Sequence, residues 1–270
     1  MNAVLKYPGA KWRLAEWIIG RFPPHHSYLE PFFGSGAVLF NKTRSHIETV
    51  NDLDGDVVNL FRCIRQDPEK LARVVHYTPY SRQEYESACL LEIQAGPFER
   101  AARFLIRCNQ GYGFRTNESR VGWKNDVQGR ERAYAAKNWI ELPEVIAQAA
   151  ERLRGVQIEN RPAVEVIARF KSENVLIYCD PPYILSSRSG GKRQYKHEMT
   201  DADHEELLAV LKEHRGPVLI SGYPSELYDR ELRDWRRETH TATDQLSRRR
   251  REVLWMNFEP NQRQETLFTK

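Results

Sequence analysis

The chain has 270 residues, of which 40% are hydrophobic and 29% are charged, so it can bury a core and is not a disordered chain. Its 41 Lys and Arg residues against 37 Asp and Glu give a net charge of +4, which is compatible with nucleic acid without establishing it. No apolar stretch approaches the roughly 20 residues of a membrane helix, and residues 1–11 lack the apolar run of a secretory signal. We therefore expect a cytoplasmic protein that does not enter a membrane.

The cysteine and histidine residues do not predict a metal site. The four cysteines form no Cys-x-x-Cys pair and no zinc-ligand spacing with histidine, so we expect reduced thiols. His25 and His26 follow two prolines, where neighbouring histidines are more often exposed on a loop than bound to a metal. We predict that the protein holds no metal.

The N-terminal part predicts a β-α-β unit. Residues 10–21 carry apolar side chains at helical spacing, residues 27–33 form a strand, and a glycine turn with a short helix follows. Residues 47–53 form a second strand, and a helical pattern continues from Val57 to Ile64. This order predicts a parallel sheet with helices on its faces.

The strand–helix alternation stops between residues 68 and 139. This part shows helical patterns at 82–91 and 98–108, then a loop from 109 to about 130. Residues 97–139 hold nine basic and four acidic side chains, so the excess positive charge of the chain lies here. We predict an inserted, largely helical subdomain over 68–139.

The alternation resumes in the C-terminal half. We predict strands at 156–158, 175–179, 217–221 and 252–258, and helices at 163–171, 201–214 and 225–235. The continuous apolar run 175–179 is typical of a central parallel strand, and Thr200 with Asp203 forms a helix-capping pattern. The prediction is an α/β, Rossmann-like, mostly parallel sheet built from 1–67 and 140–270.

A first set of motif residues indicates a nucleoside-type ligand. Gly34 and Gly36 lie between a strand and a helix, where glycine lets a ligand approach the backbone closely. The third glycine of the dinucleotide fingerprint is replaced by Leu39, which disfavours a nicotinamide cofactor. Asp52 ends the next strand, where an acid can accept hydrogen bonds from ribose hydroxyls. Either motif alone could be an ordinary turn; together they indicate an adenosine-type cofactor.

A second motif, Asp180-Pro181-Pro182-Tyr183, directly follows the apolar run 175–179. Ligands of open α/β sheets bind beyond the carboxyl ends of strands, which is where this tetrapeptide falls. The prolines fix the backbone and remove two N–H donors, Asp180 supplies an acceptor, and Tyr183 supplies a flat face. This combination suits the amino group of a flipped-out base, although a proline turn with a buried tyrosine is the alternative.

These motifs resemble the Dam-type (alpha-class) adenine N6-specific DNA methyltransferases. The resemblance covers most of the chain, follows the family's motif order, and is loose only in the insert. It implies a methyltransferase-type Rossmann-like fold, S-adenosylmethionine as cofactor, double-stranded DNA as substrate, and 68–139 as the target-recognition subdomain. The matching segments are Tyr7-Pro8-Gly9-Ala10-Lys11, Glu30-Pro31-Phe32-Phe33-Gly34-Ser35-Gly36, Asn51-Asp52, Asp180-Pro181-Pro182-Tyr183, 195–200, 221–223 and 254–257.

The resemblance also implies roles for single residues. Asp180 and the Pro181 carbonyl would accept the two hydrogens of the target amine, with Pro182 completing the motif and Tyr183 stacking on the base. Several relatives carry tryptophan where Tyr7 stands, and tyrosine keeps the stacking face. The expected cofactor contacts are Tyr7, Lys11, Phe32, Gly34, Ser35, Gly36, Asp52 and Asp180.

Basic segments outside these motifs are candidates for DNA contacts. The loop 186–193 could order over DNA as a flap or be a solvated loop, and the run 248–251 could equally be a solvated hairpin end. The expected DNA-binding residues are Arg107, Arg115, Arg120, Trp123, Lys124, Arg130, Arg188, Lys192, Arg193, Lys196, Arg248 and Arg249.

Three other functions fit part of the pattern. A cytosine N4 DNA methyltransferase uses the same tetrapeptide chemistry, an RNA adenine methyltransferase shares the reaction, and a catalytically silent DNA-binding protein shares the fold. The motif order and residues 7–11 favour adenine, and the intact tetrapeptide favours an enzyme. We expect a monomer; the recognition sequence and any companion restriction endonuclease are left open by the sequence.

Overall fold

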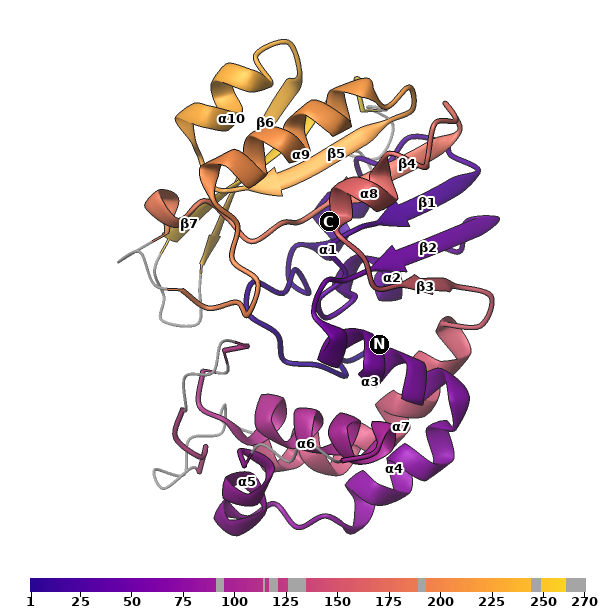
Figure 1. Ribbon diagram of the computed structural model, residues 1–270, viewed down its shortest axis with the longest axis vertical. Helices are drawn as coiled ribbons and strands as arrows, with labels where there is room; N and C mark the ends of the chain where they lie inside the picture. Colours follow the sequence, from indigo (N-terminus) through magenta and orange to yellow (C-terminus); the bar gives the residue numbers. More distant parts are fainter. Residues whose placement is uncertain are drawn as a thin grey trace, which may run out of the picture.

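The computed structural model describes residues 1–90, 95–113, 115–116, 121–125, 135–188, 193–243 and 249–260, and its centre is a seven-stranded sheet. The strand order is β3-β2-β1-β4-β5-β7-β6 (Figure 1). The first five strands in this order pair in parallel, and β7 pairs antiparallel with both β5 and β6. The strands are β1 (Ser27–Glu30), β2 (Ile47–Asn51), β3 (Gln157–Glu159), β4 (Val175–Cys179), β5 (Val218–Gly222), β6 (Arg236–Thr243) and β7 (Arg249–Met256).

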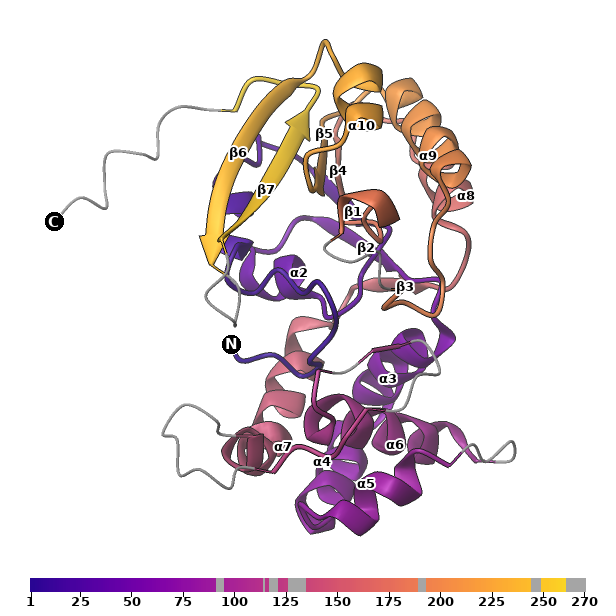
Figure 2. The same cartoon turned by 90° about the vertical axis from the view of Figure 1, so that its left-hand side faces the viewer.

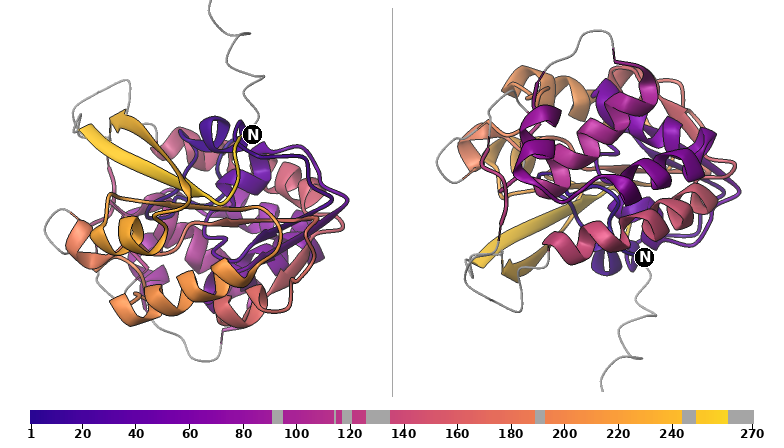
Figure 3. Two further views of the ribbon diagram at one scale, coloured as in Figure 1. Left: turned by 90° about the horizontal axis from the view of Figure 1, so that it is seen from above. Right: turned by 90° about the horizontal axis from the view of Figure 1, so that it is seen from below.

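Helices cover both faces of the sheet. On one face lie α8 (Ala163–Ile167), α9 (Asp201–Glu213) and α10 (Glu226–Glu231). The short 3-10 helix η1 (Leu185–Ser187) lies between β4 and α9 in the chain. The other face packs against α1 (Ala15–Ile19) and α2 (Ala37–Asn41). In the orientation of Figure 1 a layer of helices lies below the sheet, and Figures 2 and 3 show this layer from the side and from below. That layer contains α3 (Gly55–Gln66), α4 (Pro68–Tyr77), α5 (Arg82–Ala88), α6 (Pro97–Gln110) and α7 (Ala135–Arg152).

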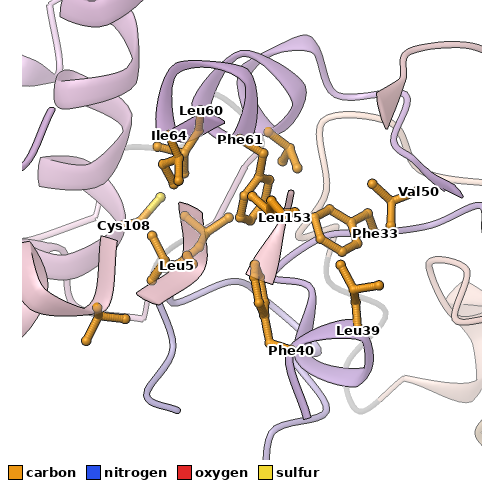
Figure 4. Close-up of a cluster of buried hydrophobic side chains, with 14 of the residues drawn as sticks. Leu5, Phe33, Leu39, Phe40, Val50, Leu60, Phe61, Ile64, Cys108 and Leu153 are labelled. Atoms are coloured by element: carbon orange, nitrogen blue, oxygen red, sulfur yellow. The ribbon is translucent and has the colours of Figure 1, made fainter. Parts of the chain in front are cut away.

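The core follows from the two-residue period of the strands. Successive strand residues point to opposite faces, so Tyr178 and Leu219 join one buried cluster while Ile177 and Ile220 join the other. The first cluster extends from the sheet into the helical layer, with Phe33 and Phe61 in edge contact at 4.8 Å (Figure 4). Burial of both faces explains why β4 is hydrophobic throughout and why β5 has a single polar residue, Ser221.

The predicted elements agree closely with the observed ones where the local pattern is strong. β4 has the predicted limits, and the Thr200–Asp203 capping box begins α9 as expected. The helix predicted at 10–21 is shorter, because only Ala15–Ile19 is α-helical. The subdomain limit after residue 139 falls inside the continuous helix α7. The edge strand β6 was missed, because its side chains are almost all charged or polar.

The parallel strands bring functional motifs to one edge of the sheet. The carboxyl ends of β1, β2, β4 and β5 carry Glu30, Asp52, Asp180 and Ser221, which are far apart in the sequence. Within the described ranges, no helix is both long and apolar enough to cross a membrane. No group of His, Cys, Asp or Glu side chains there is arranged to hold a metal ion.

Candidate active site

A cavity of about 810 Å³ opens at this edge of the sheet. Its volume is within the range of natural ligand sites and is large enough for a nucleoside-sized molecule and a base. Its walls come from the N-terminal segment, the carboxyl ends of the strands and the segment 193–200. The predicted site residues that line it are Tyr7, Lys11, Phe32, Gly34, Ser35, Asp52, Asp180, Pro182, Arg193 and Lys196.

Asp180 is held through both of its carboxylate oxygens. Oδ1 accepts a hydrogen bond of 2.7 Å from the Ser221 hydroxyl, and Oδ2 lies 2.9 Å from the Lys11 ammonium. Lys11 also donates to the Gly9 carbonyl at 2.6 Å. Burial alone would lower the pKa of Lys11, but the carboxylates of Asp180 and Glu252 raise it above its ordinary value. The ammonium is therefore charged at neutral pH and fixes the orientation of Asp180.

The rest of the tetrapeptide continues this network. The Tyr183 hydroxyl donates to Glu252 at 2.7 Å, and the Tyr223 ring meets the Tyr183 ring edge-on at 4.6 Å. The Lys11 ammonium lies over one face of the Tyr183 ring, 4.7 Å from its centroid, so a stacked base would have to take the opposite face. Within the described part of the chain, no protein donor bonds to the carbonyl of the buried Pro181.

Asp52 and the glycine turn form the second half of the cavity. The Asp52 carboxylate accepts backbone N–H bonds from Gly34 at 2.7 Å and from Asp54 at 2.9 Å. Burial raises the pKa of Asp52 to about 7. Gly34 has φ +48°, and a Cβ there would lie 3.1 Å from the Tyr7 ring, so the ring covers the turn closely. Sequence and geometry thus agree on why residue 34 is glycine.

Two other turn residues have different roles. The Ser35 hydroxyl accepts a hydrogen bond of 3.2 Å from the Trp12 indole, which ties the turn to the N-terminal segment. Gly36, expected in the cofactor loop, is not among the residues lining the cavity. It has φ +68°, and a Cβ there would lie 2.6 Å from ring carbons of both Phe33 and Phe40. Packing of the turn therefore requires glycine at this position.

The segment 193–200 closes one side of the cavity. One oxygen of Glu198 accepts hydrogen bonds from Arg188 at 2.9 Å, from the Gln194 N–H at 2.6 Å and from the Tyr195 N–H at 2.9 Å. Its other oxygen pairs with Arg188 at 2.8 Å. Tyr195 donates in turn to the Pro8 carbonyl at 3.1 Å. Arg188, expected to contact DNA phosphate, is 9% exposed and pairs with Glu198 in this structure, so its contact with DNA stays a prediction.

Thr116 joins the helical part of the chain to this segment. Its N–H donates to the Gln194 carbonyl at 2.9 Å, and its hydroxyl accepts from the Lys196 N–H at 2.9 Å. Thr116 therefore fastens the helical part of the chain to the segment 193–200, and the sequence analysis did not identify it.

The remaining candidates for DNA contacts are spread over the molecule. Arg107 donates to the Ala88 carbonyl at 3.0 Å and lies 3.9 Å from Asp56 with its side chain 26% exposed, so its contact with DNA stays a prediction. Trp123 donates to Gln110 at 3.3 Å and pairs across a short β-bridge with Gly111, close to the partly buried Arg115 and Lys124 in sequence. The positions of Arg120, Arg130, Lys192, Arg248 and the side chain of Arg249 lie outside the described residues.

The charge of the cavity limits which cofactor it fits. Seven Asp and Glu side chains line it, against three Lys and Arg side chains, and burial raises the pKa of Glu30 to about 8, so that this one is protonated at neutral pH. An acid-rich wall opposes a phosphate-bearing cofactor, whereas it suits an adenosine ligand that has no phosphate and carries a positive sulfonium. Asp52 offers acceptors for ribose hydroxyls at one end of the cavity, and the buried Glu30 adds a further carboxyl. The residues present fit S-adenosylmethionine.

Sequence reasoning missed several residues of the site. Glu30 and Ser221 lie within segments that carried the family resemblance, but their side chains had not been assigned a role. Glu252 follows a run of four arginines, which drew attention to the basic charge instead.

The Lys6 ammonium is buried without a hydrogen-bond partner among the described residues, and burial and the nearby Lys124 lower its pKa to about 8.

Comparisons with known proteins place the chain among DNA methyltransferases. A family model described as D12 class N6 adenine-specific DNA methyltransferase matches residues 7–246. The DNA adenine methylase of Serratia marcescens is 26% identical over 244 residues, which cover 87% of this chain and 86% of that protein. That of Escherichia coli (strain K12) is 26% identical over 87% of this chain and 84% of its own length. The DNA N-6-adenine-methyltransferase of Escherichia phage P1 is 26% identical over 84% of this chain and 31% of its own length.

Proposed function

The chain belongs to the D12 class of N6 adenine-specific DNA methyltransferases, and on that premise we propose how its residues carry out the reaction. The methyl donor is S-adenosylmethionine, and the acceptor is the N6 amine of an adenine rotated out of double-stranded DNA. One observation carries the proposal: Asp180 is fixed at the end of β4 by Lys11 and Ser221, and it lines the same cavity as Asp52, the acid expected to bind ribose. The adenine-specific family sets aside the cytosine N4 alternative.

Asp180 and Pro181 activate the amine. A carboxylate has about four lone-pair sites, so Asp180 can accept an amine hydrogen while Ser221 and Lys11 each keep one. The Pro181 carbonyl accepts the second hydrogen. These bonds draw the nitrogen away from conjugation with its ring and direct its lone pair at the methyl group. The N–C bond would form as the bond from methyl to sulfur breaks, the sulfur would leave as a neutral thioether, and the amine would give one proton to the Asp180 carboxylate. Positioning and electrostatics supply the catalysis, and no covalent intermediate with the enzyme is needed.

The opposite half of the cavity holds the methyl donor. Asp52 accepts hydrogen bonds from its ribose hydroxyls, while Gly34 and Ser35 form the turn against which it lies. The donor supplies an electrophilic methyl group on a positively charged sulfur, and the carboxylates of the cavity suit that charge. Tyr7 covers the turn and excludes water from this end.

The helical part of the chain recognises the target DNA. In this proposal the insert 68–139 contacts the duplex through the region of Arg115, Trp123 and Lys124, and Lys196 and Arg193 contact it beside the cavity. The Lys196 side chain is 46% exposed, and its ammonium lies 3.9 Å from the buried Asp54, so a phosphate contact in this proposal would exchange that partner or add to it. The enzyme acts as a monomer in this proposal.

Mass spectrometry of the methylated base tests the proposal. The purified protein is incubated with S-adenosylmethionine and unmethylated double-stranded DNA, RNA or single-stranded DNA, and the products are digested to nucleosides. We expect N6-methyladenine from double-stranded DNA, and none with Asp180→Ala that still binds DNA. Methylation of RNA alone, or turnover by Asp180→Ala, would refute the assignment. If the unaltered protein binds DNA but methylates none of the three substrates, the alternative of a catalytically silent DNA-binding protein would be favoured.

A further inference from the structure

Ser221 stands beside the catalytic tetrapeptide on the neighbouring strand. β4 and β5 pair in parallel with Cys179 opposite Ile220, so Asp180 and Ser221 occupy the next position in register. Residues two apart on a strand share a face, which places Tyr178, Asp180 and Ser221 on the same side of the sheet. Ser221 is 1% exposed, and its hydroxyl lies 2.7 Å from Asp180 Oδ1.

The direction of these hydrogen bonds can be worked out from the donors present. The Ser221 hydroxyl has one hydrogen and three candidate acceptors: Asp180 Oδ1 at 2.7 Å, the Cys179 carbonyl at 3.3 Å and the Tyr178 hydroxyl oxygen. The Tyr178 hydroxyl lies 3.2 Å from the Ser221 oxygen. Burial raises the pKa of Tyr178 well above its ordinary value, so it stays protonated and can donate. When Tyr178 donates to Ser221, the serine hydrogen is left for the shorter bond to Asp180.

We propose that Ser221 is a positioning residue for methyl transfer and that Tyr178 orients its hydroxyl. The chain Tyr178 to Ser221 to Asp180 fixes the rotation of the carboxylate from the sheet side, while Lys11 fixes it from the N-terminal side. Hydrogen bonds in such a chain strengthen one another in a buried site. Asp180 is thereby presented with its remaining lone pairs toward the cavity before any base enters. This inference rests on the proposed role of Asp180.

A positioning role predicts a loss in the rate of chemistry alone. Ser221→Ala should lower kcat and the single-turnover rate about 10- to 100-fold, the usual effect of losing a hydrogen bond to a charged group. The KM values for S-adenosylmethionine and DNA should stay within about 3-fold, because Ser221 touches neither in the proposal. Tyr178→Phe should lower kcat less, because the serine hydrogen is then free to turn to the Cys179 carbonyl.

Tyr228→Phe is the matched control. Tyr228 is another buried tyrosine, 3% exposed, whose hydroxyl bonds to His204 on the opposite face of the sheet. It should lower thermal stability as Tyr178→Phe does and leave kcat unchanged. Ser221→Ala combined with Tyr178→Phe should be no slower than Ser221→Ala alone, since both act through one hydrogen bond.

The outcomes separate this inference from the proposed function. The inference is overturned if Ser221→Ala and Tyr178→Phe both keep kcat within about 2-fold of the unaltered enzyme, or if their losses are entirely in KM. It is also overturned if the double variant shows the product of the two single losses. In each of these cases methylation by the unaltered protein and its loss in Asp180→Ala still establish the role of Asp180.

Discussion

The Lys11 ammonium lies 2.9 Å from the Asp180 carboxylate, which joins the N-terminal segment to the end of β4 across 169 positions of sequence. Lys11 had been expected to contact the cofactor, and it does line the cavity. Its position against Asp180, and over the Tyr183 ring, gives it a second role in the catalytic half of the site. One buried cation therefore orders two members of the tetrapeptide.

The first prediction concerns the unequal burial of this ion pair. Lys11 is 5% exposed and Asp180 is 18% exposed, and Asp180 keeps Ser221 as a second partner. Asp180→Ala leaves a deeply buried ammonium and should cost about 3–5 kcal/mol of unfolding free energy, more than Lys11→Met costs. Urea unfolding of both variants measures this order. Lys11→Met with Asp180→Asn removes both charges and should recover much of the stability without recovering activity; a double variant as unstable as Asp180→Ala would contradict the argument.

The second prediction separates the stacking face of Tyr183 from its hydroxyl. Tyr183→Phe should lose less methyl transfer than Tyr183→Ala, because only the latter removes a stacking face, worth about 1–3 kcal/mol per base. The phenylalanine variant keeps the ring and removes only the hydroxyl that donates to Glu252, so its loss reports on that hydrogen bond. Single-turnover rates test this, and equal rates for Tyr183→Phe and Tyr183→Ala would exclude stacking.

The third prediction is that cofactor affinity depends on pH through Asp52. Burial raises the pKa of Asp52 to about 7, and ribose hydroxyls donate best to the ionised form. Binding then releases a proton, so affinity should rise about 10-fold between pH 6 and pH 8. Asp52→Asn should bind more weakly and lose this dependence. Calorimetric titration in the absence of DNA measures it, and the same pH dependence in Asp52→Asn would assign the proton to another group.

The comparison of sequence and structure shows which features are encoded locally. The apolar run of β4 ends at Asp180-Pro181, and the capping pattern of α9 begins at Thr200, so both were placed correctly from neighbouring residues. The edge strand β6 begins with three charged residues and then alternates threonine with His240 and Ala242, so only its pairing with β7 identifies it. The predicted strand began at residue 252, whereas β7 begins at Arg249, because its first residues are arginines and do not show an apolar strand pattern.

The side-chain partners of the site were harder to predict, because they lie far apart in the sequence. The positive charge of Arg188 is visible in the sequence, but the Glu198 carboxylate that buries and neutralises it depends on how the segment folds back. Ser221 reaches Asp180 only because β5 lies beside β4. Motifs therefore located the site, while its supporting hydrogen bonds required the sheet topology.

The fourth prediction is a pH dependence of stability in the cofactor-free protein. Burial raises the pKa of Glu30 to about 8, so the folded state holds its proton more tightly than the unfolded state does. The contribution of Glu30 to the unfolding free energy is fully present below the ordinary pKa of glutamate. It is lost as pH rises toward 8, by up to about 1.4 kcal/mol per pH unit. Glu30→Gln should flatten this slope, because glutamine does not titrate. The variant should still fold, because the glutamine oxygen can accept the hydrogen bond from the Tyr28 hydroxyl. Urea unfolding from pH 5.5 to 8.5 tests the difference, with Asp52→Asn compared separately because Asp52 acts in the same direction below pH 7.

The fifth prediction concerns the segment 193–200, which Glu198 anchors. Burial alone would raise the pKa of Glu198, but hydrogen bonds from Arg188 and from two backbone N–H groups lower it, so the carboxylate is charged. Glu198→Gln keeps the shape of the side chain and removes the charge that offsets the nearly buried guanidinium. Amide hydrogen exchange should then speed up across 193–200, and cofactor affinity should fall about 10-fold, because this segment forms a wall of the cavity.

A surface ion pair provides the control for this last change. Glu205 lies 3.6 Å from Arg230 with both side chains more than half exposed, so Glu205→Gln should change neither exchange in 193–200 nor cofactor affinity. If amide hydrogen exchange across 193–200 is unchanged in Glu198→Gln, then Tyr195 and Thr116 hold the segment without the Glu198 charge. Adding S-adenosylmethionine should restore part of the protection in Glu198→Gln, because a ligand that binds only the closed arrangement favours it by mass action. Protection that does not respond to the cofactor would place its binding site away from this wall.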